Sequence, residues 1–256
     1  MRPSRVLKKL RAGEVATCFN VHFDAQVTDI AGMAGYDCVW IDNEHMAQDW
    51  SSIQMHIWAA KSHDMDVMTR VSRGSYNDIV KPMELDSAGI LVPHVMGVED
   101  ARSVVKMTRF HPIGRRPIDG GNADAGYATI GFDDYLPQAN EQRFLGVQIE
   151  DPEPLDELDE IASLDGIDML FFGPGDFSHG IGAPGQWNHP KLIEARRRVA
   201  EVAVKHGKFA GTPGSLDNFD ELMDMGYRFI VVGADVIGVG DYIRKLVDGI
   251  TKKTNG

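Results

Sequence analysis

The sequence predicts an α/β fold, a single (β/α)₈ TIM barrel, and three observations support this prediction. Eight short apolar runs recur, and they are continuous rather than alternating, as in parallel strands buried on both faces. A stretch with helical character follows each run, and the pattern fits eight times into 256 residues, the usual size of such a barrel. A doubly wound open sheet is the alternative, but it leaves the last two units hard to place.

The predicted strands share a high content of β-branched and aromatic residues. They are 15–21, 36–42, 66–71, 89–95, 143–150, 168–173, 208–212 and 228–235. The predicted helices are 24–34, 49–63, 76–87, 97–109, 153–164, 190–206, 216–225 and 239–252. Turn and capping residues support several boundaries. The segment from Ser215 to Asp217 is a helix-start signal, and Gly226 is a plausible helix stop.

Residues 111–140 form an unusually long connection that is rich in glycine and aspartate and weakly periodic. Loops of this length inside a compact domain tend to be functional, so we expect an active-site or interface loop here. A second irregular stretch, 178–190, follows Asp176. Because no linker or internal repeat divides the chain, we expect one barrel domain over residues 1–256.

Composition excludes several classes of protein. The net charge is −12 without a basic stripe, which argues against a nucleic-acid partner. No apolar run approaches 20 residues, which argues against a membrane span, and the start of the chain lacks the apolar region of a secretory signal. Cys18 and Cys38 lie in apolar runs, so we expect them to be buried and reduced, and the protein to be cytoplasmic.

Two of the predicted strands lead into acidic residues. The run "GVQIED" brings Glu150 to the end of one strand, and "MLFFGPGDFS" places Asp176 just after the next. Neighbouring strands of a barrel end at the same face, so both carboxylates can reach one point. Carboxylates without thiolates and with few imidazoles suit a hard ion, Mg²⁺ or Mn²⁺. The alternative is a pair of acids that cap helix N-termini, and spacing alone does not decide between the two.

Arg70 and His45 are further candidates at strand ends. The guanidinium of Arg70 suits a carboxylate or an enolate oxygen, although a buried ion pair with Glu84 or Asp42 is an equal alternative. Acidic residues surround His45, and the pKa of an ordinary histidine lies near neutrality, so it is the candidate for proton transfer. We interpret His94 as a hydrogen-bonded core residue.

Lysine is missing from the predicted strand ends, since Lys208 only opens a strand. A Schiff-base mechanism requires a desolvated amine in the pocket. Activation of a carbonyl group would therefore fall to a metal ion acting as a Lewis acid.

Together these segments resemble the HpcH/HpaI aldolases, the class II pyruvate aldolases that include 4-hydroxy-2-oxoheptanedioate aldolase and 2-keto-3-deoxy sugar-acid aldolases. "WIDNEHMAQDW" resembles the family's D-G-E-H segment, "VQIED" its V-Q-I-E strand and "FFGPGDFS" its G-P-x-D-L-S loop. Arg70 falls where the family places its substrate arginine. The resemblance covers nearly the whole chain in order.

The resemblance implies a barrel of the pyruvate-binding type whose last helix is exchanged between subunits, usually in a hexamer. It implies Mg²⁺, Mn²⁺ or Co²⁺ held by Glu150 and Asp176, with Gln148 supporting the metal. The substrate carboxylate would bind backbone amides of the loop around Gly175, and Arg70 would bind the keto oxygen.

The resemblance also implies that His45 acts in proton transfer and that Glu84 is the carboxylate that orients it. The implied reaction is reversible cleavage of a 4-hydroxy-2-oxo acid to pyruvate, or a close analogue, and an aldehyde. The small-molecule partners would then be a 2-oxo acid and an aldehyde.

The chain departs from the family pattern at Asn43 for glycine, Glu84 for aspartate and Phe177 for leucine, and in the loop "PIGRRPIDGGNADAGY". Decarboxylation, or another enolate reaction on the same metal site, therefore remains an alternative. Two others are a phosphate-binding isomerase, with the anion at "GTPG" and "VVGAD", and a barrel without catalysis. The sequence does not give the aldehyde, the stereochemistry, the preferred ion or the pathway.

Overall fold

The computed structural model describes residues 1–254, which form a closed barrel of eight parallel strands in the order β1 to β8. Each strand pairs with the next, and β8 closes the barrel on β1. The strands are β1 (Ala16–Val21), β2 (Cys38–Asp42), β3 (Asp66–Arg70), β4 (Gly89–Val92), β5 (Phe144–Ile149), β6 (Met169–Phe172), β7 (Phe209–Gly214) and β8 (Phe229–Ala234). The predicted fold class is confirmed.

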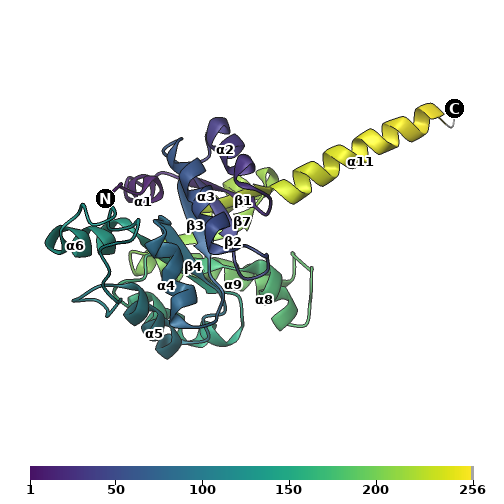
Figure 1. Cartoon of the computed structure of the whole chain (residues 1–256). Coiled ribbons are helices and arrows are strands. Elements are labelled where there is room, and N and C mark those ends of the chain that lie inside the picture. Colours follow the sequence, from purple (N-terminus) through teal and green to yellow (C-terminus); the bar gives the residue numbers. More distant parts are fainter. Residues whose placement is uncertain (255–256) are drawn as a thin grey trace.

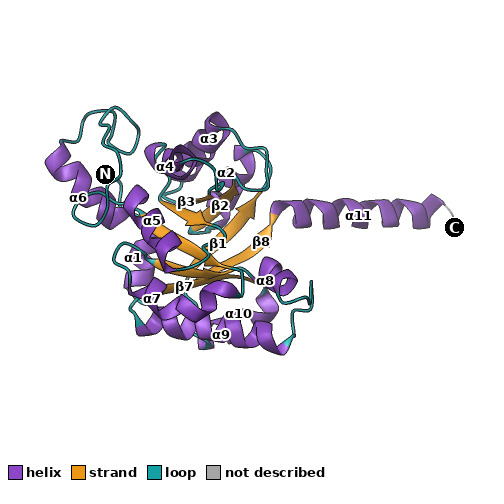
Figure 2. Cartoon of the chain, turned by 90° about the horizontal axis from the view of Figure 1, so that it is seen from below, coloured by secondary structure: helices purple, strands orange, loops and turns teal. Residues whose placement is uncertain are grey.

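Helices surround the barrel (Figure 2). Those that match the prediction are α2 (Ala25–Ala34), α3 (Trp50–Lys61), α4 (Tyr76–Glu84), α5 (Val98–Thr108), η1 (Glu153–Glu157) with α7 (Leu158–Ser163), α9 (Pro190–Lys205), η2 (Leu216–Asn218) with α10 (Phe219–Asp224), and α11 (Asp235–Thr254). None of the helices in residues 1–254 is long and apolar enough to cross a membrane.

The barrel interior is filled by large apolar side chains. Trp40 and Phe171 meet edge to face with ring centroids 5.6 Å apart, and Met68 belongs to the same cluster. Cys18 and Cys38 are paired in register on β1 and β2, and both are fully buried with free thiols. The prediction that both cysteines are buried is confirmed.

Three helices were missed by the sequence analysis: α1 (Arg5–Arg11), α6 (Phe132–Gln142) and α8 (Pro174–Gly180). α1 lies across the N-terminal end of the barrel, where the strands begin, and packs Val6, Leu7 and Leu10 into the interior cluster. α8 lies at the C-terminal end, where the strands end. Figure 1 places α1 and α6 at one side of the barrel and α8 at the other.

The long connection is shorter than predicted, because residues from Phe132 onward form α6. Its helical periodicity is weak in sequence, since only Tyr135 and Ala139 are buried and Pro137 lies inside the helix. The connection leaves the end of α5 and leads to the start of β5, so it lies at the N-terminal end of the barrel. Within one chain, this connection does not reach the C-terminal end of the barrel, where the strands end.

Asp124 fixes this connection to the barrel. The carboxylate lies 2.7 Å from Arg143 Nε and 3.0 Å from Arg116 Nη2, and it accepts a hydrogen bond of 2.9 Å from the Tyr135 hydroxyl. All four side chains are buried. Arg143 also pairs with Asp86, so two carboxylates compensate the two guanidinium groups that hold the loop.

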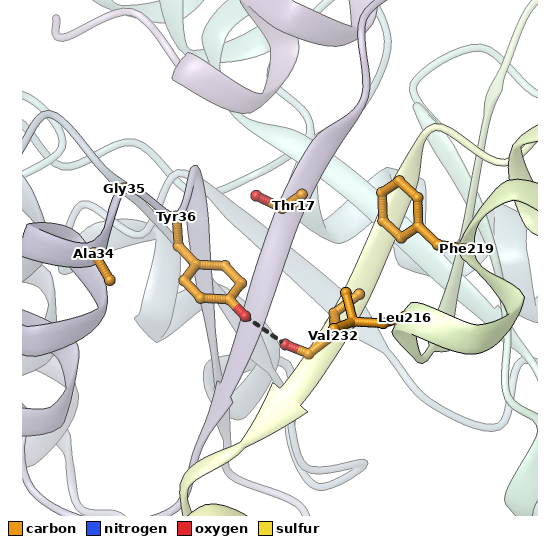
Figure 3. A pocket seen from close by; sticks show the side chains of 7 residues that line it. All are labelled: Thr17, Ala34, Gly35, Tyr36, Leu216, Phe219 and Val232. Atoms are coloured by element: carbon orange, nitrogen blue, oxygen red, sulfur yellow. Dashed lines mark hydrogen bonds between the residues drawn. The ribbon is translucent and has the colours of Figure 1, made fainter.

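α11 leaves the C-terminal end of β8 and projects away from the barrel (Figures 1 and 2). One apolar set of its side chains is exposed, including Ile237, Tyr242, Ile243 and Ile250. An apolar groove lies between α2 and α10, over β1 and β8, and the hydroxyl of Tyr36 donates to the Val232 carbonyl within it (Figure 3). The groove is lined by Thr17, Ala34, Gly35, Tyr36, Leu216, Phe219 and Val232.

Candidate metal and oxo-acid site

Three metal-ligating side chains converge at the C-terminal end of the barrel. His94, Glu150 and Asp176 each place a ligand atom within 4.8 Å of the others. His94 follows β4, Glu150 follows β5, and Asp176 lies in the first turn of α8. The structure thus brings together the two carboxylates that the sequence singled out and adds a histidine that it did not.

Glu150 is almost fully buried, and both of its oxygens accept hydrogen bonds. The backbone N–H of His94 donates to Oε1 over 2.8 Å, and the amide of Gln148 donates to Oε2. Burial raises the pKa of Glu150 to about 7; the N–H and charge of His94 oppose this, while the charges of Asp176 and Glu44 add to it. A carboxylate this poorly compensated favours binding of a cation.

His94 is not in the core, because 39% of its side chain is exposed. Its Nδ1 lies 2.8 Å from Asp151 Oδ2 and 3.8 Å from Glu150 Oε1, while Nε2 lies 3.8 Å from Glu44 Oε1. Burial lowers the pKa of His94, but the hydrogen bond to Asp151 and the charge of Glu150 outweigh it and raise the value. The interpretation of His94 as a core residue is therefore wrong.

Two buried polar atoms at the site accept no hydrogen bond within residues 1–254, namely Gln148 Oε1 and Glu44 Oε2. Glu44 Oε2 has the charge of Arg70 nearby, whereas Gln148 Oε1 has no partner, and a buried polar atom without one is costly and calls for a donor or a cation from a ligand. Carboxylates, an amide oxygen and one imidazole form a donor set that suits a six-coordinate divalent ion. The residues present fit such an ion.

Arg70 lies beside this cluster in a buried ion pair with Asp42. Its Nε and Nη2 donate to the two carboxylate oxygens over 3.0 and 2.5 Å, and Nε also lies 3.2 Å from Glu44 Oε2. Burial lowers the pKa of Arg70, but the hydrogen bond and charge of Asp42 outweigh it and raise the value. No described group accepts a hydrogen bond from Nη1, which leaves that nitrogen for a ligand.

His45 and Glu84, a predicted pair, lie at opposite ends of the barrel. His45 follows β2 at the C-terminal end, with 58% of its side chain exposed and Nε2 3.6 Å from Glu44 Oε2. Glu84 ends α4, which leads back to the N-terminal end, and its carboxylate accepts a hydrogen bond of 3.0 Å from Lys81. Within one chain, the carboxylate near His45 is Glu44.

Glycine has two different roles at the start of α8. A Cβ on Gly173 would lie 2.7 Å from Glu150 Cβ and 2.8 Å from Gln148 Nε2, so this residue permits the close packing of the loop on β5. A Cβ on Gly175 would meet nothing within 4 Å. The first N–H groups of a helix have no partner inside it, so the N–H groups of Gly175 and Asp176 remain as donors beside the open space at Gly175.

Two rival chemistries find little support in the geometry. Lys208, whose pKa burial lowers, precedes β7 at the N-terminal end and donates to the Leu164 carbonyl. The amides that a phosphate would use near the end of β8 already bind a carboxylate. Asp235 accepts hydrogen bonds from the N–H groups of His22, Phe23 and Val236 over 2.7–2.8 Å.

The sequence matches a protein-family model along nearly the whole barrel. The family model described as HpcH/HpaI aldolase/citrate lyase covers residues 16–239. The chain belongs to the HpcH/HpaI aldolase/citrate lyase family. The predicted family is confirmed, and so is the predicted enzyme class, a divalent-metal-dependent class II aldolase.

The relatives of this HpcH/HpaI family member include several named aldolases. A hydroxypyruvate/pyruvate aldolase from Roseobacter denitrificans is 34% identical over 232 residues, which are 90% of this chain and 90% of that protein. A 5-keto-4-deoxy-D-glucarate aldolase from Enterobacter sp. strain 638 is 29% identical and covers 98% of both chains.

Solved structures of the family share the fold. An HpcH/HpaI aldolase from Desulfitobacterium hafniense DCB-2 is 24% identical and superposes with a TM-score of 0.90 over 96% of both chains. Macrophomate synthase is 27% identical, with a TM-score of 0.83 over 99% of this chain and 90% of that one.

Three residues that the sequence pattern did not single out also contribute to the site, namely His94, Asp151 and Glu44. A signal existed for each, since Glu44, His94 and Asp151 all lie within two residues of the end of an apolar run. The predicted strand 89–95 absorbed His94, but β4 ends at Val92, because Pro93 has no N–H for the ladder. Treating every polar residue after a strand as a site candidate would have found them.

Proposed function

We propose that the protein catalyses the reversible cleavage of a 4-hydroxy-2-oxo acid into pyruvate, or a close analogue such as hydroxypyruvate, and an aldehyde. The observation that carries this proposal is the convergence of Glu150 and Asp176 from neighbouring strands beside unpartnered Gln148 Oε1. The names of the relatives support the same class of substrate.

Glu150 and Asp176 are the proposed ligands of a divalent ion, Mg²⁺, Mn²⁺ or Co²⁺. When bound, such an ion polarises the keto group of the substrate as a Lewis acid. Gln148 orients Glu150 through the hydrogen bond to Oε2, and its free Oε1 can accept a hydrogen bond from a water in the site.

Arg70 and the start of α8 position the oxo acid in this proposal. The free Nη1 of Arg70 donates to the keto oxygen and offsets negative charge as it develops there, while Asp42 holds the guanidinium in place. The backbone N–H groups at Gly175 and Asp176 bind the substrate carboxylate at the N-terminal end of the helix.

His45 is the proposed proton-transfer group, because its imidazole is exposed at the mouth of the site. The C4 hydroxyl gives up its proton, the C3–C4 bond breaks to release the aldehyde, and the enolate is protonated at C3. Glu44, at 3.6 Å, orients His45 within one chain. A role for Glu84 stays a prediction that requires the subunit arrangement of a homo-oligomer.

Product analysis with and without EDTA tests the proposed reaction. Metal-stripped protein, pyruvate or hydroxypyruvate and a panel of aldehydes should give no 4-hydroxy-2-oxo acid, and addition of one divalent ion at a time should restore product. Full activity in the presence of EDTA would contradict the proposal. Asp235→Asn serves as a matched control for loss of an acid at the same end of the barrel outside the proposed metal site.

A second enolate reaction is favoured by one observation, the breadth of the family itself, whose description joins aldolases with citrate lyase. Decarboxylation of oxaloacetate would use the same metal, Arg70 and Gln148. Incubation with oxaloacetate alone separates the two reactions, since only decarboxylation forms pyruvate without an aldehyde.

We also propose a homo-oligomer, a hexamer, in which α11 of one chain fills the apolar groove of another. In support, the 20-residue α11 exposes an apolar face, and the groove between α2 and α10 has the place of an eighth barrel helix. Light scattering of the chain and of a variant shortened at residue 238 tests the exchange, which predicts dissociation of the shortened chain.

We further propose the cytoplasm as the compartment of this protein, with which its two free buried cysteines are compatible.

A further inference from the structure

We infer that His94 is a third protein ligand of the divalent ion, through Nε2, and that Asp151 fixes the ring for this role. This inference rests on the proposed function and extends it, since it sets which ions the site prefers. An imidazole in place of a water ligand distinguishes this site from one built on two carboxylates alone.

The backbone at His94 is held in a conformation that points to a function. Its φ of 47° lies in the left-handed region, which residues other than glycine seldom adopt. Two hydrogen bonds fix it there, from His94 N–H to Glu150 Oε1 at 2.8 Å and from Val95 N–H to the Gln148 carbonyl at 3.4 Å. Strained residues of this kind persist where the surrounding structure requires them, often at ligand sites.

The ring of His94 is oriented so that one nitrogen remains free. Nδ1 lies 2.8 Å from Asp151 Oδ2, and the carboxylate accepts the Nδ1 proton, which leaves the lone pair on Nε2. A carboxylate, a histidine and a metal ion in this order form a recurrent arrangement that fixes the tautomer and raises the basicity of the ligand.

The alternative role of His94 is an ion pair with Asp151 and nothing more. That role accounts for the contact of Nδ1 but not for the position of the ring beside Glu150 and Asp176. The acidic side chains around the ring exceed what one imidazole can compensate, since Glu150, Asp151 and Asp176 all lie at this point and Arg70 pairs only with Asp42 and Glu44. A divalent ion supplies the missing positive charge.

A nitrogen ligand changes the expected metal preference. Carboxylate and water ligands suit Mg²⁺, whereas imidazole favours transition metals such as Co²⁺. The site should therefore bind Co²⁺ and Mn²⁺ more tightly than Mg²⁺. His94→Gln, which offers oxygen instead of nitrogen, should weaken Co²⁺ and Mn²⁺ binding by roughly 10- to 100-fold and Mg²⁺ binding much less.

The direct test is electron spin-echo envelope modulation of metal-stripped protein loaded with one equivalent of Mn²⁺ alone. We expect modulation from a directly bound ¹⁴N in the unaltered protein, its replacement by ¹⁵N coupling after ¹⁵N-histidine labelling, and its loss in His94→Gln. His45→Gln and His179→Gln are matched controls in which the modulation should persist. Circular dichroism establishes that each variant is folded.

Asp151→Ala provides a second variant that leaves the ligand itself in place. It should lower Mn²⁺ affinity by roughly 10-fold in calorimetry, because the ring is no longer held, while the nitrogen modulation remains at saturating Mn²⁺. Unchanged affinity in both Asp151→Ala and His94→Gln would contradict the inference.

The outcomes separate this inference from the proposed function. Mn²⁺ that binds one per chain, requires Glu150 and shows no nitrogen coupling would overturn the role of His94 and leave the metal-dependent aldolase intact. Failure of the unaltered protein to bind Mn²⁺, Co²⁺ or Mg²⁺ at all would overturn both.

Discussion

The two ends of the barrel both bury acidic side chains but treat them differently. At the N-terminal end, Asp124 meets Arg116 and Arg143, Asp168 meets Arg109, and Asp37 meets Arg5 and Lys9. At the C-terminal end, Arg70 is already paired with Asp42 and Glu44, and the three further acids Glu150, Asp151 and Asp176 share one histidine.

This difference separates the acids that stabilise the fold from the acids that can bind a ligand. Acids with full partners contribute to stability only as members of a pair, and loss of one member leaves a buried charge. Acids without a cationic partner destabilise the metal-free protein, and binding of a cation removes this destabilisation. Asp124 and Glu150 are both almost fully buried, so the local charge balance is the feature that distinguishes them.

Asp124→Asn should produce the largest change in stability, because it leaves Arg116 buried without a carboxylate and takes one of two carboxylates from Arg143. We expect the free energy of unfolding to fall by about 3–5 kcal/mol, measured by urea denaturation. Glu150→Gln is the matched substitution at the other end and should not destabilise the metal-free protein. Equal destabilisation by both would abolish the distinction between the two ends.

The stability of the metal-free protein should decrease as pH rises, because of Glu150. Its pKa is raised from 4.5 to about 7 in the native state, so the native state binds the proton more tightly than the unfolded state. The penalty is absent below pH 4.5, grows between pH 4.5 and 7, and is complete above pH 7, where it reaches about 3 kcal/mol.

Urea denaturation at pH 5 and pH 8 in EDTA measures this penalty. The difference between the two pH values should shrink by about that amount in Glu150→Gln, whose side chain does not titrate. A pH dependence that is the same in both proteins would assign the effect to other groups.

Glu150→Gln should lower aldolase activity by at least about 100-fold, because loss of a direct ligand exceeds the usual cost of losing a residue that only orients a ligand. Mn²⁺ affinity, followed by calorimetry, should fall in parallel. Wild-type turnover in this variant would remove Glu150 from the metal site.

The smallest effect on stability should come from Gly175→Ala, in the first turn of α8. In Gly175→Ala the new methyl group meets no atom of its own chain, so the unfolding free energy should change by less than about 0.5 kcal/mol. The KM for the oxo acid should nevertheless rise about tenfold if the substrate carboxylate approaches this backbone, an effect of about 1.4 kcal/mol.

Gly173→Ala should behave differently, because its methyl group would collide with Glu150 and Gln148. We expect a loss of about 1–3 kcal/mol of stability together with a loss of activity. Identical behaviour of the two variants would show that Gly175 faces no ligand.

The fold class and four of the site residues could be predicted from the sequence alone. Eight continuous apolar runs with helices between them allow few other topologies, and parallel strands end at one face, so Glu150, Asp176, Arg70 and His45 had to share the C-terminal end. These inferences depend on periodicity and chain direction, which are local properties of the sequence.

The ion pairs and the positions of several side chains follow from the tertiary structure, because the local sequence pattern does not encode them. It assigned Asp42 to Arg70, placed Glu84 and the long connection at the N-terminal end, and turned His94 toward Glu150 through a left-handed backbone. Pairing of charges depends on distances between residues far apart in the chain, and burial sets whether an acid keeps its proton. Both follow only once the strands have closed the barrel.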